Sequence, residues 1–393
     1  MSDKTALYDA SVLLHMDGFD DLERSNPEPN PFWNRARFEV AWALPEMAGL
    51  LKDGRISLQP MRLATREELL LFHDVSYIET IELFGNSGVA FSSRFGLDTP
   101  ECPVFQDMHK YVSYPVGAVI DATLAVAEGR FKNAMSFIGG FHHAFESKAT
   151  GFCYYNDCVI AIKKFKKLYP GKRVLYLDTD VHHGDGTQAA FYDDPEVLTI
   201  SMHELSMSFF PGTGRPEEMG IGEGKGYSVN IPLPPLTDDG HFLWAFDDVV
   251  KPLWYSFKPD LVFWNVGADA HHGDPLADLM LTYSSYGILA RKVLKMVNKG
   301  NGKLVAVGGG GYNPISAAIV WTAVLSVISG VDIPSEYPED WIELCQSHGL
   351  TVPREDWIDG PTIMNDIHLP GIRRTVSESI EKIKKLVFPI HGL

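Results

Sequence analysis

The sequence predicts an α/β fold built on a largely parallel β-sheet with helices on both faces. Short apolar segments recur from residue 134 onward, and most are separated by segments with helical periodicity. Alternating strands and helices favour right-handed crossovers and a parallel sheet. Most of these strands run directly into polar or glycine-rich loops, which such a sheet would gather at one edge. The predicted strands span 134–138, 174–177, 197–201, 261–266 and 303–307, and the helices among them span 156–168, 242–257 and 283–297.

The segments before residue 134 predict helices and loops. Residues 26–32 and 91–103 are predicted loops because of their proline, asparagine and serine content. Residues 37–51, 65–85 and 116–128 carry helical spacing. No linker or composition break divides the 393 residues, so we expect one domain that spans residues 1–393.

Bulk composition narrows the class of protein. Hydrophobic residues make up 45% of the chain, enough for a large core, and 34 basic against 51 acidic residues give a net charge of −17. This charge argues against non-specific nucleic-acid binding. It suits a cationic substrate, although many ordinary enzymes are equally acidic. The four cysteines show no zinc-knuckle spacing, and neither a signal sequence nor an apolar run long enough to span a bilayer is present. We therefore expect a cytoplasmic protein with no membrane partner.

Residues 174–191 (VLYLDTDVHHGDGTQAAF) carry the strongest chemical signal. A buried strand turns abruptly polar, with Asp178, Asp180, His182, His183 and Asp185 in eight positions. Buried charges are costly unless a cation or a partner compensates them. Asp180 and His182 lie two apart, so in extended backbone they point to one side and can share an ion. A capped helix start explains only one or two of these residues.

Residues 265–275 (NVGADAHHGDP) supply a third ligand. Asp269 follows an apolar strand and completes a set of two carboxylates and one imidazole with Asp180 and His182. Three protein ligands with an open position are typical of catalytic zinc. Two carboxylates make the site harder than a three-histidine site, so iron(II) and manganese stay open, with zinc the first choice. His271 and His272 are predicted to be structural, because the following Gly-Asp-Pro indicates a turn.

Two further loops carry candidate catalytic groups. His142 and His143 follow a strand and two glycines, and an adjacent pair alone is more often a surface pair. Asp178 and Asp185 are available to hold their second nitrogens, which would make them tuned acids or bases. The run GGGGY at 308–312 lacks the spacing of a phosphate loop. We favour a loop that presents Tyr312 as a donor to an oxyanion, although a packing role for this tyrosine stays open.

The sequence resembles zinc-dependent histone deacetylases. The motifs FHHA, GFCYYND, DTDVHHGDGTQAAFYDD, FFPGTG, GADAHHGDPL and GGGGY occur in the order found in that family. The chain is most similar to the bacterial and archaeal acetoin-utilisation-type members, which resemble class I enzymes. The resemblance covers about residues 65–330, with an atypical N-terminal segment at 1–60 and a C-terminal helical extension at 331–393. It implies the arginase/deacetylase fold, one α/β domain around an eight-stranded, mostly parallel sheet.

The resemblance also implies roles for individual residues. The zinc ligands would be Asp180, His182 and Asp269. The catalytic residues would be His142, His143 and Tyr312, with the supporting carboxylates Asp178 and Asp185. The substrate-binding residues would be Glu101, Gly151, Phe152, Phe210 and Leu276, with the two phenylalanines as walls of a tube for the lysine methylenes. A first structural potassium or sodium ion would use Asp178, Asp180, His182, Ser201 and Met202. A second would use main-chain oxygens of Phe191, Asp194, Val197 and Tyr227.

Three departures from the family pattern are apparent. Glu101 stands where the family usually has an aspartate that holds the substrate backbone. Asn30-Pro31 replaces a His-Pro motif, and either Arg35 or Arg37 stands in for the usual arginine. Residues 8–30 have no counterpart that can be placed.

The expected activity is removal of acetyl or other short acyl groups from lysine ε-amines of proteins. Acetylpolyamine hydrolysis is the nearest alternative, but Leu276 occupies the position of an acidic gatekeeper. A di-manganese ureohydrolase would need more bridging carboxylates. A non-catalytic acyl-lysine binder would normally lack a metal ligand or the tyrosine, and both are present.

Overall fold

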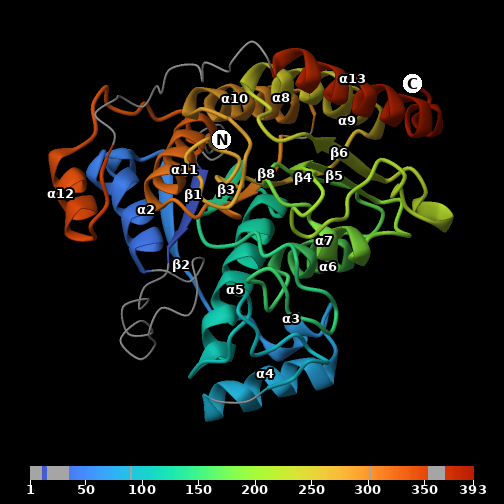
Figure 1. Ribbon diagram of the computed structural model, residues 1–393. Coiled ribbons are helices and arrows are strands. Elements are labelled where there is room, and N and C mark those ends of the chain that lie inside the picture. The colour runs from blue at the N-terminus through green and yellow to red at the C-terminus, as the bar shows by residue number, and fades with distance from the viewer. Residues whose placement is uncertain (1–10, 16–34, 89–90, 301, 353–367) are drawn as a thin grey trace, which may run out of the picture.

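The computed structural model describes residues 11–15, 35–88, 91–300, 302–352 and 368–393. Within these residues a central sheet has the strand order β2-β1-β3-β8-β7-β4-β5-β6, and every pairing is parallel (Figure 1). Its eight strands are β1 (Ser11–His15), β2 (Ile56–Pro60), β3 (Asn133–Ser136), β4 (Val174–Asp178), β5 (Val197–Glu204), β6 (Ser228–Leu233), β7 (Leu261–Asn265) and β8 (Leu304–Val307). The predicted parallel α/β architecture is confirmed.

Helices cover both faces of the sheet. They are α2 (Arg35–Met47), α3 (Arg66–Leu69), α4 (Val75–Ser87), α5 (Met108–Ala127), α6 (Asp157–Leu168), α7 (Asp185–Ala190), α8 (Asp239–Ala245), α9 (Lys251–Phe257), α10 (Tyr283–Lys299), α11 (Pro314–Ser329), α12 (Glu339–Ser347) and α13 (Leu369–Leu386). A π-helical turn, Phe246–Val250, joins α8 to α9. Among the described residues, no helix is both long and apolar enough to cross a lipid bilayer.

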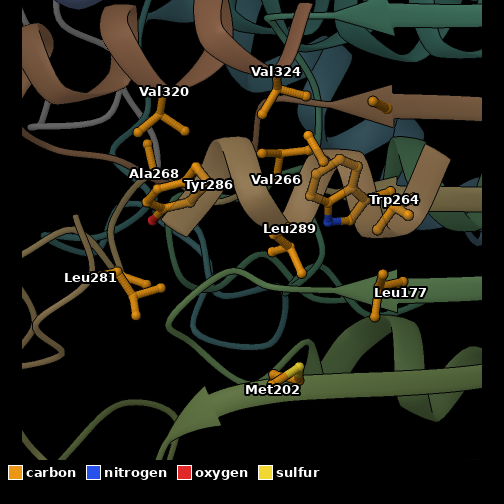
Figure 2. Packing of buried hydrophobic residues seen from close by; sticks show 14 of the residues in the cluster. Leu177, Met202, Trp264, Val266, Ala268, Leu281, Tyr286, Leu289, Val320 and Val324 are labelled. Atoms are coloured by element: carbon orange, nitrogen blue, oxygen red, sulfur yellow. The ribbon is translucent and has the colours of Figure 1, made fainter. Parts of the chain in front are cut away.

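The alternation of side chains along the strands divides the core in two. Leu175 and Leu177 of β4 pack into one hydrophobic cluster with α2, α10, α11 and α13. Val174 and Tyr176 of the same strand pack into the other with α4, α5 and α6. Figure 2 shows part of the first cluster, including Trp264 of β7. Successive side chains of β4 point to opposite faces of the sheet. Because helices cover both faces, every residue of this strand is buried.

The sequence-based boundaries need several corrections. The structure adds β1, β2, β6 and α11 to the predicted elements. The single helix predicted at 65–85 is two helices, because the chain turns at His73, whose imidazole is buried between other segments. The helix predicted at 116–128 begins eight residues earlier, at Met108, and continues through the buried Pro115. The predicted loop at 26–32 lies outside the described residues.

Trp321 of α11 joins the ends of two central strands. Its indole Nε1 donates to the carbonyl oxygens of Val266 and Gly308, both at 3.0 Å, and these residues directly follow β7 and β8. The side chain is fully buried. One hydrogen-bond donor therefore helps fix the two strand ends from which the loop that carries Asp269 and the glycine-rich loop begin.

We expect Trp321→Phe to lower the free energy of unfolding by about 1–3 kcal/mol more than Trp254→Phe does, because only Trp321 loses a buried hydrogen bond. Trp254 is the matched control, since its buried indole nitrogen has no hydrogen-bond partner among the described residues. Urea denaturation monitored by circular dichroism measures both changes. Equal losses of unfolding free energy in the two variants would show that the hydrogen bonds of Trp321 to the strand ends contribute nothing to stability.

Candidate active site

Three predicted ligands converge at the carboxyl edge of the sheet. Asp180 and His182 lie in the loop that follows β4, and Asp269 lies in the loop that follows the adjacent strand β7. Their ligand atoms all lie within 4.8 Å of one another, and the three side chains are buried. The imidazole Nδ1 of His182 is 3.3 Å from Asp180 Oδ1 and 3.2 Å from Asp269 Oδ2. Two strands side by side thus unite ligands that are far apart in the sequence.

Backbone amides hold the carboxylates in place. The Gly310 amide donates to Asp180 Oδ2 at 2.6 Å, and the Val181 amide donates to Asp269 Oδ1 at 3.0 Å. A Cβ atom at Gly310 would lie 2.0 Å from Asp269 Oδ2. Glycine is therefore required there, because any side chain would collide with this carboxylate. Such outer hydrogen bonds fix the orientation of metal ligands.

The donor set fits a divalent cation. Burial and the neighbouring Asp180 raise the pKa of Asp269 to about 7. Burial alone would lower the pKa of His182, but hydrogen bonds to the two carboxylates outweigh it and raise the pKa to about 10. In the absence of a metal, the protonated imidazole ring of His182 supplies the positive charge. Its Nδ1 proton faces both carboxylates. A metal ion would replace this proton, which is how binding to such a site releases protons.

The tandem histidines lie beside the ligands, each with its own carboxylate. His142 Nδ1 donates to Asp178 Oδ2 at 2.8 Å, and His143 Nδ1 donates to Asp185 Oδ1 at 2.7 Å. The two Nε2 atoms are 3.0 Å apart, so one of them carries a proton that the other accepts.

Opposite pKa shifts separate the two imidazoles. Burial opposes the charge on His142, but Asp178 and Asp180 outweigh it and raise its pKa to about 9. Burial and the adjacent His142 lower the pKa of His143 to about 4. A cation bound by Asp180 would draw the pKa of His142 down again, because it would screen one of the carboxylates that raise it.

A pocket of about 260 Å³ opens above these groups. It brings together all five predicted substrate-binding residues with His143, His182 and Tyr312, and it adds Ser208 and Phe209 to them. The Phe209 ring stacks on the His182 ring, with centroids 5.0 Å apart and an interplanar angle of 7°. The motif FFPGTG contains this residue, but the family resemblance assigns a role only to the second phenylalanine of the motif, Phe210.

A strained turn places one wall of the pocket. Residues Thr150 and Cys153 exchange both backbone hydrogen bonds, and between them Gly151 and Phe152 have φ values of +54° and +65°. Positive φ at a phenylalanine is unfavourable and needs support from its surroundings. Glu101 gives such support, because its Oε2 accepts the Gly151 amide proton at 3.1 Å.

Tyr312 is the last residue of the glycine-rich run and borders the pocket. Its amide donates to Asp274 Oδ2 at 2.6 Å, and its ring packs edge-on against Phe152 with centroids 5.6 Å apart. Burial raises the pKa of its phenol well above the ordinary value, so the hydroxyl stays a hydrogen-bond donor.

Arg37 reaches this region from α2. Its Nε donates to the Gly311 carbonyl at 2.6 Å and its Nη2 donates to the Gly309 carbonyl at 2.7 Å. The Arg35 side chain, Asn30-Pro31 and the segment 16–30 lie outside the described part of the chain. A buried guanidinium from the N-terminal region therefore holds the loop that carries Tyr312.

Asn156, Asp157 and His73 support the tandem histidines and were missed by sequence reasoning. Asp157 accepts the amide protons of Gly140 and Phe141, both at 2.8 Å. Asn156 Nδ2 donates to the carbonyl of His142 at 3.2 Å. No sequence pattern identifies side chains that act by hydrogen bonds to the main chain. Asn156 and Asp157 do lie within the motif GFCYYND.

His73 in turn supports Asn156. Its Nδ1 donates to the Glu146 carbonyl at 3.1 Å, and its Nε2 accepts the Asn156 amide proton at 3.0 Å. Both ring nitrogens are therefore used in the neutral form, and a second ring proton would face the Asn156 N–H.

The remaining predicted residues lie around the same strands. His271 stacks on Tyr283, with centroids 4.1 Å apart, and its Nδ1 accepts the Gly273 amide proton, which agrees with the structural role predicted for it. Ser201 of β5 pairs in register with Asp178 of β4, and Met202 follows it. Farther along, the Asp194 amide donates to the Phe191 carbonyl, the Val197 amide to the Asp194 carbonyl, and the Thr199 amide to the Tyr227 carbonyl.

Comparisons with known proteins agree with this geometry. Residues 32–328 match the model of the histone deacetylase domain. The chain is 39% identical over 326 residues to the acetoin utilization protein AcuC of Bacillus subtilis, with 81% of this chain and 83% of that protein covered. It is 35% identical over 361 residues to AcuC of Staphylococcus aureus strain MSSA476, with 91% of each covered.

Solved structures extend the likeness to three dimensions. A crystal structure of a histone deacetylase homolog from Aquifex aeolicus has a TM-score of 0.84 and 30% identity, covering 95% of this chain and 100% of that one. A crystal structure of such a homolog complexed with SAHA matches with the same TM-score and identity, covering 95% and 99% of the two chains.

His73 should make stability depend on pH. Burial lowers the pKa of its imidazole to about 4, below the ordinary 6.5, so the unfolded chain binds this proton first as the pH falls. The stabilisation is complete above about pH 6.5 and is lost at about 1.4 kcal/mol per pH unit down to the folded pKa. His73→Gln should therefore reduce the stability difference between pH 7 and pH 5 by about 2 kcal/mol.

Urea titrations of the wild type and His73→Gln at the two pH values measure this difference. His368→Gln, at an exposed histidine, controls for the loss of one titratable group. An unchanged pH difference in His73→Gln would mean that His73 is not kept neutral in the folded state.

Proposed function

The chain belongs to the histone deacetylase family, as a member of the acetoin-utilisation type, and from this premise we propose that it is a zinc-dependent lysine deacylase. The substrate would be an acetyl-lysine, or a lysine with another short acyl group, in a protein. One observation carries the proposal. His182, His143 and Tyr312 line one 260 Å³ pocket with aromatic walls, the other two candidate ligands adjoin His182, and His142 adjoins His143.

Asp180, His182 and Asp269 would hold the zinc ion. When bound, zinc would act as a Lewis acid on the amide carbonyl and lower the pKa of a water molecule toward about 7. The donor set supports this choice, because three protein ligands leave a position open.

The side chains of this protein perform the remaining tasks. His143, neutral because of its low pKa, accepts the proton of the attacking water, with His142 beside it. The protonated member of the pair then donates to the leaving lysine amine. Asp178 and Asp185 fix the rings through their Nδ1 hydrogen bonds. The Tyr312 hydroxyl donates a hydrogen bond to the negative charge that develops on the acyl carbonyl oxygen.

The pocket lining supports a long, unbranched substrate side chain. Phe152 and Phe210 would enclose the lysine methylenes, with Gly151 and Leu276 beside them. Burial of four methylenes in such a tube would contribute about 0.8 kcal/mol each. Glu101 brings one carboxylate to the rim, where it would meet backbone amides of a peptide. Because that carboxylate would equally meet a cationic amine, acetylpolyamines remain the comparison substrates.

Two structural potassium or sodium ions are further parts of the proposal. The first would be held by oxygens of Asp178, Asp180, His182, Ser201 and Met202. The second would be held by main-chain oxygens of Phe191, Asp194, Val197 and Tyr227.

We also propose that the chain forms one deacylase domain in a reducing cytoplasm. The packing of α12 on α2 and of α13 on β6 supports the first point, and four free, buried cysteines support the second.

Metal dependence tests the proposal directly. The wild type should bind one zinc ion per chain and release acetate from an acetyl-lysine peptide more readily than from acetylspermidine. Asp269→Asn should bind zinc at least about 100-fold more weakly, since even loss of an outer-shell partner costs up to that much. Metal content after dialysis and acetate release measure the two effects, with Asp340→Asn, at an exposed position of α12, as the control.

Each rival activity has its own signature in this experiment. Two tightly bound manganese ions per chain would indicate a ureohydrolase instead. Acyl-peptide binding without acetate release would indicate a binder. Full hydrolysis by the metal-free protein would overturn the proposal.

Tyr312→Phe should lower kcat by about 10²–10³, because it removes one oxyanion donor, while KM stays nearly constant. Steady-state kinetics with the acetyl-lysine peptide measure both constants. Tyr169→Phe, at the end of α6, is the matched control and should leave both unchanged. A Tyr312→Phe enzyme that keeps more than a tenth of kcat would assign Tyr312 to packing alone.

A further inference from the structure

A second hollow, separate from the pocket described above, lies between α9 and α10. It has a volume of about 150 Å³ and shares no lining residue with the substrate pocket. Its lining consists of Phe246, Asp247, Lys251, Tyr255, Lys292, Lys295, Met296 and Lys299. Four of these eight residues are lysines, and one is acidic.

The lysines come from two elements and face the same space. Lys292, Lys295 and Lys299 follow one another at intervals of three and four along α10, so they lie on one face of that helix. Lys251 begins α9 and lines the hollow from the other side. Lysines from one helix alone would be an ordinary solvated face. Here two helices contribute lysines to one concavity.

Most of this positive charge is uncompensated. Lys292 forms an ion pair with Asp247 at 2.6 Å. Lys251, Lys295 and Lys299 form no ion pair with any residue that the structure describes, so four lysines and one aspartate leave a net charge of +3 in the hollow. The chain has 51 acidic residues and only 34 basic ones, so most lysines on its surface have acidic residues available to pair with. Three lysines in one hollow without an ion pair to a described residue are therefore unusual for this chain. Unscreened ammonium groups side by side repel one another, which an anion would relieve.

The floor and one wall of the hollow are suited to more than a simple ion. Phe246 and Met296 are buried beneath it, whereas the Tyr255 ring is 41% exposed. Lys299 Nζ lies 3.4 Å from the Tyr255 hydroxyl and 5.9 Å from the ring centroid. The π-helical turn Phe246–Val250 brings Phe246 and Asp247 to the hollow, and turns of this rare kind recur at functional sites.

We propose that this hollow binds a small anion that carries a pyrophosphate group. Lys251, Lys295 and Lys299 would contact the phosphate oxygens, as compact point charges do in phosphate sites. Tyr255 offers an exposed ring on which the base of a nucleoside diphosphate can stack. Extended polyanions such as RNA or an anionic membrane fit less well, because the net charge of −17 repels them over the rest of the surface.

Calorimetric titration of the full-length chain with inorganic pyrophosphate, at low ionic strength, tests this site without any assay of hydrolysis. The wild type should bind one pyrophosphate per chain. The double variant Lys295→Glu/Lys299→Glu should bind it at least about 10-fold more weakly, since two attractive charges become repulsive. The double variant Lys110→Glu/Lys167→Glu makes the same charge change at exposed lysines outside the hollow and should bind within about 2-fold of wild type.

Further arms separate the sources of the anion and guard against a folding defect. The milder Lys295→Gln/Lys299→Gln variant should give an intermediate loss, with an unchanged circular dichroism spectrum. ADP that binds more tightly than pyrophosphate, and loses this advantage in Tyr255→Ala, assigns a nucleotide; equal affinity assigns pyrophosphate itself. Equal weakening in the two Glu double variants, or no binding at millimolar pyrophosphate, overturns the proposal. So does lysine-dependent binding to anionic lipid vesicles without binding of pyrophosphate.

Discussion

The close approach of two buried carboxylates, Asp180 and Asp269, is the constraint on which the site depends. Two like charges in a dry interior are unfavourable unless a positive charge lies between them. In this protein His182 faces both carboxylates, and a backbone amide holds the far oxygen of each. The parallel pairing of β4 with β7 makes this encounter possible, since both strands end at the same edge. The surrounding loops then serve to keep this charge arrangement rigid and largely sealed from solvent.

Much of this rigidity comes from hydrogen bonds to main-chain atoms. Arg37 holds two carbonyls of the glycine-rich loop, and Asp157 holds two amides ahead of the tandem histidines. The chemically reactive side chains therefore face the pocket, and buried polar side chains behind them hold the loops in place. Because each support bonds to backbone, a substitution there shifts a whole loop rather than one side chain.

The sequence predicted the parts of the fold that periodicity marks and failed where it does not. Five central strands were found because they are continuous apolar runs, as expected for strands buried on both faces. The edge strand β6 was not predicted because Pro232 interrupts its apolar pattern. A proline is tolerated there because β6 lies at the edge of the sheet. At the site, Asp180, His182 and Asp269 were predictable since each lies in the loop that follows an apolar strand. His73 and Asn156 were not, because no local pattern marks the hydrogen bond between them, which joins positions 83 residues apart.

The distribution of the three candidate metal ligands along the chain also bears on how the protein is made. Asp269 lies 87 positions after His182, and the amide that orients Asp180 belongs to Gly310, 130 positions after that aspartate. A growing polypeptide that has just emerged past residue 182 offers only a two-donor fragment with no fixed geometry. The full set of donors comes together only after β7 has paired with β4 and β8 has paired with β7. A metal ion held by these side chains would therefore be bound late in biosynthesis, and a chain that ends before the glycine-rich loop would lack the amide that orients Asp180.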